Sequence, residues 1–158
     1  MLTPDLFNYF LTGEKKAEYT MSTTTQLMDI RNKVWSDKLL DKLSIPLRIF
    51  PEIIPSGTVV GTVSTKICDE LGISPAKVVA VASHDTQSAV AAVPTQEDDF
   101  IFISCGTWSL FGTELEKPVV GKESYEMNVS NEGGYGGTYN FLKNIIGLWL
   151  AQESRRHW

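Results

Sequence analysis

Residues 78–93 read VVAVASHDTQSAVAAV, and the order of residue types in this stretch decides the fold. The stretch begins with an apolar run, Val78–Ala82, of β-branched and small residues, which is typical of a strand buried on both faces. Polar residues 83–86 follow, and residues 87–93 are mostly small and compatible with a helix. Because α/β proteins place their chemistry where the carboxyl end of a strand meets a helix, the SHDT corner at residues 83–86 is the first candidate site.

Asp85 stands at this corner, near the expected start of the helix. The helix dipole favours an ionised carboxylate at that position, and a carboxylate at the end of a strand can accept a proton. Aspartate also commonly caps helices, and spacing alone leaves the catalytic and the capping interpretation open. His84, taken alone, is typical of a structural histidine.

Composition and charge exclude several classes of protein. Of the 158 residues, 42% are hydrophobic and 21% are charged, which is a globular composition. The net charge of −5, with no basic cluster beyond Arg155–Arg156, argues against a nucleic-acid partner. We expect neither a membrane span nor a secretory signal, because no apolar run is long enough and the start lacks a basic region before an apolar core. Cys68 and Cys105 lack a CxxC partner, which disfavours a zinc site and favours a cytoplasmic location.

The sequence up to residue 99 predicts alternating helices and strands. We expect a helix at residues 3–12 that ends at Gly13 and buries an apolar face, made of Leu6, Phe7, Phe10 and Leu11. We expect further elements as follows: a polar loop or irregular packing segment at 14–30, helices at 35–43 and 65–71, and a β-type segment at 57–64 broken by Gly61. Residues 94–99 are polar, acidic and begin with proline, so we place a domain boundary there.

The remaining sequence predicts a hairpin, a glycine-rich segment and a final helix. Strands are expected at 100–104 and 108–115, joined by a tight turn that could expose Gly106 and Thr107 to phosphate oxygens or could be a plain hairpin turn. The segment NEGGYGG, residues 131–137, lacks the GxxxxGK[ST] pattern and indicates a tight backbone passage. A helix at 141–155 would align Asn144, Leu148 and Gln152 on one side, which could equally be a solvated face.

Six segments, taken in order, resemble the FGGY family of carbohydrate kinases. They are PDLFNYFLTGEK at 4–15, TTTQLMD at 23–29, SHDT at 83–86, SCGTWSL at 104–110, NEGG at 131–134 and LKNIIGLWLAQE at 142–153. Each segment alone is a weak signal, and their order across nearly the whole chain carries the resemblance. It is strongest to the branch that phosphorylates L-rhamnulose, to which GTWSL and LKNIIGLW are specific.

The resemblance implies a fold and an activity. The fold would be α/β, with two RNase-H-like (actin-like ATPase) domains and a cleft between them. Residues 1–94 would be the C-terminal part of the first, sugar-binding domain, 95–99 the linker, and 100–158 the N-terminal part of the second, nucleotide-binding domain. With ATP and Mg²⁺ the enzyme would convert L-rhamnulose to L-rhamnulose 1-phosphate in rhamnose catabolism, in the cytoplasm.

The resemblance also implies roles for single residues. Asp85 would be the general base, and it would bind the sugar together with His84, Thr86 and Asn144. The nucleotide would be bound by Gly106, Thr107 and Gln152. The resemblance implies no protein ligand for a metal ion.

Parts of the family pattern are missing, which leaves other functions open. The first strand of the family with its Asp-x-Gly phosphate turn, and its later glycine-rich adenosine pocket, are not found in this sequence. We therefore expect a central segment of a kinase, inactive by itself. The alternatives are another FGGY kinase acting on L-fuculose or xylulose, an actin-like nucleotide switch without sugar dependence, and a non-catalytic fragment that associates through exposed sheet edges.

Overall fold

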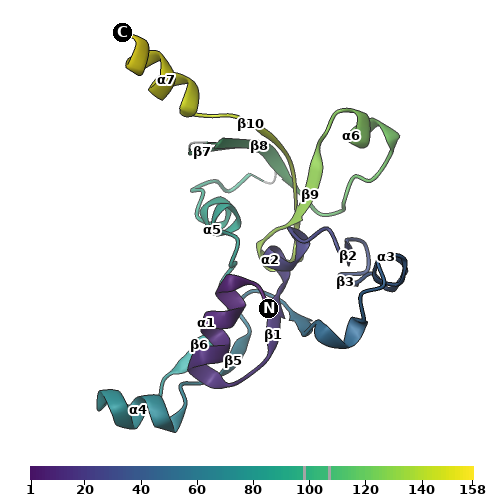
Figure 1. The fold of residues 1–158 in the computed structure, drawn as a ribbon. Helices are drawn as coiled ribbons and strands as arrows, with labels where there is room; N and C mark the ends of the chain where they lie inside the picture. The colour runs from purple at the N-terminus through teal and green to yellow at the C-terminus, as the bar shows by residue number, and fades with distance from the viewer. Residues whose placement is uncertain (98, 107) are drawn as a thin grey trace.

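The computed structural model describes residues 1–97, 99–106 and 108–158, and it shows a mixed α/β chain (Figure 1). The elements that precede the SHDT corner, from α1 to β6, lie together in the lower part of Figure 1, and we call them the N-terminal elements. A four-stranded sheet lies above them, and we call it the C-terminal sheet. The last helix projects away from this sheet, with the C-terminus at its tip.

The N-terminal elements are short, and their strands form three separate two-stranded pairs. Strand β1 pairs in parallel with β4, while β2 pairs with β3, and β5 with β6, in antiparallel fashion. Their bounds are α1 Thr3–Thr12, β1 Lys16–Glu18, α2 Tyr19–Thr23, β2 Met28–Asp29, β3 Val34–Trp35, α3 Asp37–Lys42, the 3-10 helix η1 Leu47–Ile49, β4 Glu52–Ile54, β5 Val59–Thr62, α4 Thr65–Leu71 and β6 Lys77–Val79.

The C-terminal sheet is antiparallel throughout, with the strand order β7-β8-β10-β9. Helix α5, Asp85–Ala91, leads into it from the SHDT corner. The elements that follow are β7 Ile101–Cys105, β8 Trp108–Leu115, α6 Lys122–Glu126, β9 Ser130–Gly133, the 3-10 helix η2 Tyr135–Gly137, β10 Tyr139–Ile146 and α7 Trp149–His157. Among the described residues, no helix is long and apolar enough to cross a membrane.

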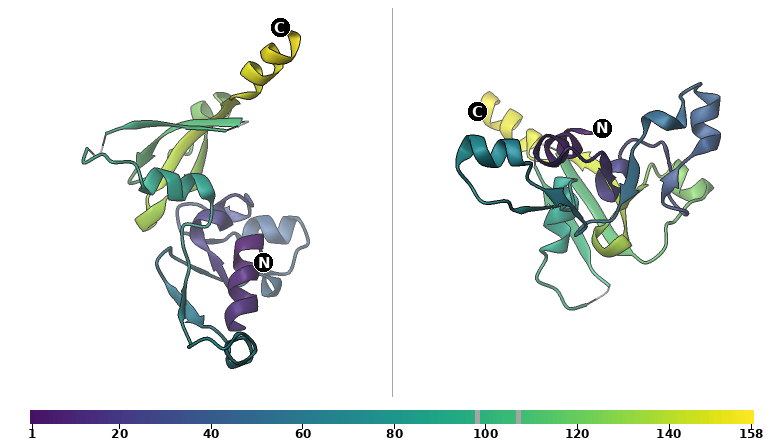
Figure 2. Two further views of the ribbon diagram at one scale, coloured as in Figure 1. Left: turned by 90° about the vertical axis from the view of Figure 1, so that its left-hand side faces the viewer. Right: turned by 90° about the horizontal axis from the view of Figure 1, so that it is seen from below.

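Helix α5 packs against the C-terminal sheet. Its Val90 forms a buried cluster with Phe102 of β7 and Leu142 of β10. The left view of Figure 2 shows the helix directly beneath the strands. A separate buried cluster of Ile54, Val60 and Ala80 stabilises the N-terminal elements. The corner that precedes α5 therefore lies between two small cores.

Several local predictions are confirmed. Helices α1 and α4 end where expected, because Gly13 and Gly72 adopt the left-handed conformation, with φ angles of 81° and 64°. The β5–β6 ladder shifts register between Val59 and Gly61, as the glycine indicated. Strands β7 and β8 form the expected hairpin.

The predicted final helix at residues 141–155 is confirmed only from Trp149 on, where α7 begins, and is wrong for residues 141–146. Strand β10 occupies 139–146 and pairs with β8 along its whole length, from Tyr139 opposite Leu115 to Ile146 opposite Trp108. Apolar runs of this kind fit a strand or a helix, and here the pairing with β8 decides. Gly147 lies between the strand and the helix, and a Cβ atom at this position would overlap Ser109 Oγ.

Three predictions about burial and loops are also wrong. The run at 78–82 is buried on one face only: Val78, Ala80 and Ala82 are buried, whereas Val79 and Val81 are 45% and 64% exposed. Helix α1 buries Asp5, whereas Phe7 and Phe10 are exposed. The stretch 14–30 is not a loop, since it contains β1, α2 and β2.

Candidate functional site

The SHDT corner forms the start of helix α5. His84 is the N-cap residue, with φ −73° and ψ 117°, and its side chain makes no capping bond. Asp85 is the first helical residue, and its side chain is exposed, with Oδ1 accepting a hydrogen bond of 2.7 Å from the backbone N–H of Thr86. Thr86 itself is buried. Of the three predicted sugar-binding residues in the corner, Asp85 is the most accessible.

Glu18 holds the backbone of the corner. This carboxylate is fully buried and accepts five hydrogen bonds, from the backbone N–H groups of Thr20, Met21 and Ser83 and from the hydroxyls of Thr20 and Ser56. The Thr20 hydroxyl in turn accepts the N–H of His84 at 3.2 Å. Two consecutive N–H groups of the corner are thus bonded to this buried network.

Glu132 on β9 approaches the same corner from the C-terminal sheet. Its Oε2 accepts a hydrogen bond of 2.9 Å from Gln87 Nε2, and it lies 3.6 Å from His84 Nδ1. Gln87 is fully buried, and the side chains of His84 and Glu132 are 18% and 17% exposed. The first turn of α5 is therefore fixed by carboxylates from two distant parts of the chain.

A second contact near the corner involves the glycine-rich segment. The Gly133 N–H donates to Thr23 Oγ1 at 2.9 Å, and a Cβ atom on Gly133 would lie 2.5 Å from Cε1 of Tyr19. Lys33 Nζ donates to the Gly137 carbonyl at 2.6 Å and lies over the Tyr19 ring, 5.3 Å from its centroid. The prediction of a tight backbone passage at 131–137 is confirmed.

The Gly133→Ala variant is expected to lower the free energy of unfolding by about 1–3 kcal/mol, because the added methyl group would overlap the buried Tyr19 ring. Urea denaturation of both proteins measures the difference. Gly121→Ala is the matched control, since its φ is −168° and no atom lies within 4 Å of the new Cβ. It should lose only the preference for glycine over alanine at the N-cap of α6. Equal stability of Gly133→Ala and the parent would contradict the close contact.

Burial changes the pKa of two side chains beneath the corner. It raises the pKa of Asp5, although a hydrogen bond from the Glu18 N–H opposes the shift. It also raises the pKa of the Tyr19 phenol, and the neighbouring Tyr139 adds to this effect. The folded chain binds a proton on Asp5 more readily than the unfolded chain does. The contribution of Asp5 to stability therefore falls as the pH rises from the ordinary pKa of an aspartate through the raised pKa of Asp5.

The predicted nucleotide residues lie elsewhere. The N–H of Gly106 donates to the Trp108 carbonyl at 2.8 Å, and its own carbonyl accepts the N–H of Leu148 at 3.0 Å, which ties the turn to the start of α7. Gln152 on α7 is exposed and lines a cavity of about 340 Å³ together with Arg155 and Arg156. Thr107 lies outside the described residues.

Asn144 does not share a helix face with Gln152. It lies on β10 opposite Leu110 of β8, and its side chain is exposed. The predicted alignment of Asn144, Leu148 and Gln152 is therefore wrong, because a strand and a helix meet at Gly147.

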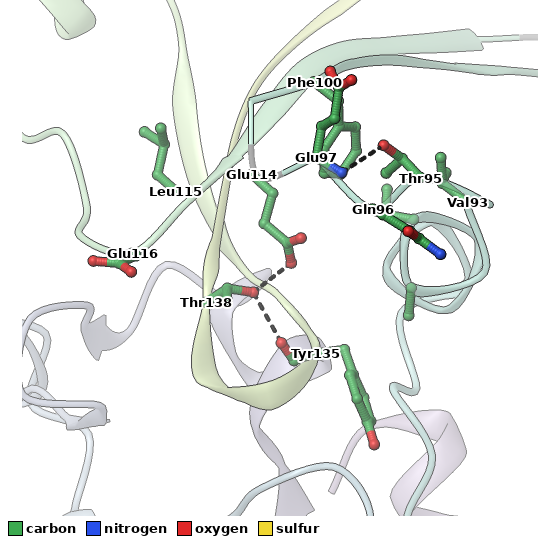
Figure 3. Close-up of a pocket in the computed structure, with 12 residues that line it drawn as sticks. Val93, Thr95, Gln96, Glu97, Phe100, Glu114, Leu115, Glu116, Tyr135 and Thr138 are labelled. Carbon is green, nitrogen blue, oxygen red and sulfur yellow. Dashed lines mark hydrogen bonds between the residues drawn. The ribbon is translucent and has the colours of Figure 1, made fainter.

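A cavity of about 440 Å³ lies beside the segment that connects α5 to β7 (Figure 3). Val90, Phe100 and Tyr135 contribute apolar surface, and the Thr138 hydroxyl donates to Glu114 Oε1 at 2.5 Å. The carboxylates of Glu97, Glu114 and Glu116 line it as well, which makes it unsuited to the phosphates of a nucleotide. None of the predicted site residues lines this cavity.

Sequence reasoning missed Glu18 and Glu132. Glu18 stands in the stretch interpreted as a loop, and it is the N-cap residue of α2, accepting from Thr20 and Met21. Glutamate is not among the residues preferred at this position, so no sequence signal pointed to it. Glu132 lies in the predicted backbone passage, and only the folded chain brings it to His84. The two cysteines are free, Cys68 buried in α4 and Cys105 exposed at the end of β7.

Comparisons with known proteins connect this arrangement to a family. Residues 1–92 match the N-terminal domain of the FGGY family of carbohydrate kinases. The chain is 45% identical over 152 residues to the rhamnulokinase of Lactiplantibacillus plantarum, covering 96% of this chain and 31% of that protein. It spans about a third of the length of the curated relatives it matches.

Two solved structures show the same fold. The gluconate kinase from Lactobacillus acidophilus has a TM-score of 0.81 and 21% identity, covering 96% of this chain and 30% of that one. The Plasmodium falciparum glycerol kinase with ADP has a TM-score of 0.74 and 19% identity, covering 95% and 31%. The expected α/β fold of the actin-like ATPase type is confirmed. This chain belongs to the FGGY family of carbohydrate kinases.

Proposed function

We propose that the chain is the catalytic-base segment of an ATP-dependent ketose kinase, which converts L-rhamnulose to L-rhamnulose 1-phosphate in rhamnose catabolism. The observation that carries this proposal is the exposed Asp85 carboxylate at the start of α5, on a corner held by buried Glu18 and by Glu132. The choice of sugar is supported by the 45% identity to the Lactiplantibacillus plantarum rhamnulokinase. Small molecules, the sugar and ATP, are the proposed partners, with neither nucleic acid nor a membrane.

Asp85 would act on the sugar hydroxyl. Phosphoryl transfer requires positioning, charge neutralisation and an acceptor for the hydroxyl proton. We assign the acceptor role to the Asp85 carboxylate, which takes the proton while the sugar oxygen bonds to phosphorus and the bond from phosphorus to the leaving oxygen of ADP breaks. His84, Thr86 and Asn144 are the proposed sugar contacts. Because Thr86 is buried, its part is to shape the pocket wall.

The three residues proposed to bind the nucleotide differ in how well their surroundings suit ATP. ATP supplies the transferable phosphoryl group when bound. Gln152 fits, because Arg155 beside it favours an anion, while Arg156 pairs with Glu153. The Gly106 N–H does not fit a phosphate contact, since it already donates to Trp108. Thr107 keeps its proposed phosphate contact.

Magnesium enters the proposal only as the ion that accompanies ATP. In the part of the chain that the structure describes, no group of three or more His, Cys, Asp or Glu side chains is arranged to hold a metal. We therefore assign no step to a magnesium ligand of this chain. Mg²⁺ in kinases commonly relies on substrate phosphates and water for most of its ligands.

The domain assignment is part of the same proposal. Residues 1–94 would belong to the sugar-binding domain, 95–99 to the linker and 100–158 to the nucleotide-binding domain. The family match, which ends at residue 92, supports this boundary. A cytoplasmic location fits the two free thiols.

A chimera tests the proposed function. In it, this chain replaces the matching segment of the Lactiplantibacillus plantarum rhamnulokinase, and ADP release is followed in a coupled assay. We expect the chimera to have a higher kcat/KM for L-rhamnulose than for L-fuculose, xylulose, glycerol or gluconate, and residues 1–158 alone to give no turnover. The parent kinase is the control.

Other results would change the assignment. A higher kcat/KM for one of the other sugars would replace the substrate. A folded chimera that hydrolyses ATP equally with and without sugar would favour the nucleotide switch. A folded chimera without any ATP turnover would contradict a catalytic role for the segment.

A further inference from the structure

His84 has a buried ring nitrogen with one carboxylate beside it. Its Nδ1 is shielded from solvent and has no hydrogen-bond partner, so the exposed 18% of the side chain belongs to other atoms. The nearby group is Glu132 Oε2, at 3.6 Å. A buried imidazole nitrogen next to a carboxylate is far more stable as an N–H donor than as a lone pair facing negative charge.

Glu132 is itself held in place. The fully buried Gln87, one turn further along α5, donates to the same Oε2 from its Nε2 at 2.9 Å. Glu132 lies on β9, which pairs with the central strand β10 of the C-terminal sheet. The orientation of the His84 ring is therefore set by a strand that is distant in sequence, while its backbone N–H is set by Thr20.

We infer that Glu132 is a positioning residue, which keeps the neutral His84 imidazole protonated at Nδ1 and thereby leaves Nε2 as a hydrogen-bond acceptor. The partner of one ring nitrogen determines which nitrogen carries the proton. An acceptor at Nε2 suits a ligand that offers a hydroxyl donor, as a sugar does. Only the contact between Nε2 and the sugar rests on the proposed function; the position of the proton on the ring does not.

The chain permits a direct test of the ring. It has two histidines, so a His157→Gln background leaves His84 as the only imidazole. Long-range ¹⁵N–¹H spectra at a pH where the ring is neutral distinguish the two protonated forms. We expect the Nδ1–H form in the parent and the Nε2–H form, which a neutral histidine side chain in water prefers, in Glu132→Ala. Glu116→Gln, at an exposed glutamate directly after β8, should leave the Nδ1–H form unchanged.

Kinetics of the chimera provide the second test. Glu132→Ala should raise KM for L-rhamnulose roughly tenfold or more, with KM for ATP unchanged, because a lost orienting partner weakens the contact made by the oriented ring. Glu132→Gln keeps an acceptor oxygen and should recover part of the loss. Thermal melting shows whether each variant is folded.

The outcomes are separable. An Nε2–H ring in the parent, or the same ring form in the parent and Glu132→Ala, overturns the inference whatever the enzyme does. If the chain alone does not fold, the chimera decides, and an unchanged KM for the sugar in folded Glu132→Ala overturns it. A parent chimera that ignores sugar defeats the proposed function, while the ring spectra still test the role of Glu132.

Discussion

Asp85→Asn in the chimera is expected to lower kcat by roughly 10²–10⁴-fold, the usual contribution of a general base. The amide keeps the shape of the side chain and its ability to bond a sugar hydroxyl, so KM for the sugar should change little. It lacks the basic oxygen that takes the hydroxyl proton. Initial rates over a range of sugar concentrations, with melting temperatures alongside, measure both effects.

A matched control and the capping interpretation complete this experiment. Asp69→Asn, at an exposed aspartate of α4, should leave kcat unchanged. If Asp85 served only the helix, Asn would replace it well and kcat would stay near normal. The finding that His84 is the N-cap residue already weakens the capping interpretation. A near-normal kcat for folded Asp85→Asn would remove the catalytic assignment.

Glu18→Gln is expected to lower the free energy of unfolding by about 2–5 kcal/mol. Donors face both carboxylate oxygens: Oε1 accepts from Thr20 N and the Ser56 hydroxyl, and Oε2 accepts from the Thr20 hydroxyl, Met21 N and Ser83 N. Whichever oxygen becomes an NH₂ group, at least one backbone N–H and one hydroxyl lose their acceptor. Chemical denaturation, or thermal melting of the chimera, measures the loss.

Glu52→Gln is the control for charge. Glu52 pairs with Lys16 at the surface, where its side chain is 70% exposed, so the melting temperature should hardly change. Equal stabilities of Glu18→Gln and Glu52→Gln would show that the buried hydrogen bonds of Glu18 contribute little.

Local signals predicted the fold well where the decisive contacts are local. The glycines at 13 and 72 stop helices through their own backbone conformation, and the β7–β8 hairpin joins neighbours in the sequence. Strand β10 was mistaken for a helix because its apolar run suits both, and its partner β8 lies some way back in the chain. Whether such a run becomes a strand depends on its partner strand, which the local sequence does not reveal.

The same distinction applies to the candidate site. Asp85 was found from its own surroundings, an apolar run followed by a polar corner. Glu18 and Glu132 could not be found in this way, because Glu18 bonds Ser83 across 65 positions and Gln87 bonds Glu132 across 45. Burying a carboxylate is unfavourable unless hydrogen-bond donors offset the loss of hydration. The importance of such a residue can therefore be recognised only once the structure shows which donors surround it.

The contrast between the two thiols gives a means of observation. Cys68 is buried, while Cys105 is exposed. Cys105 directly precedes Gly106, whose carbonyl accepts a hydrogen bond from the N–H of Leu148, just before α7. A thiol-reactive fluorophore would therefore attach to Cys105 selectively, without any engineered cysteine. Its emission would report on the surroundings of the β7–β8 turn, and titration with a nucleotide would show whether that turn senses occupancy.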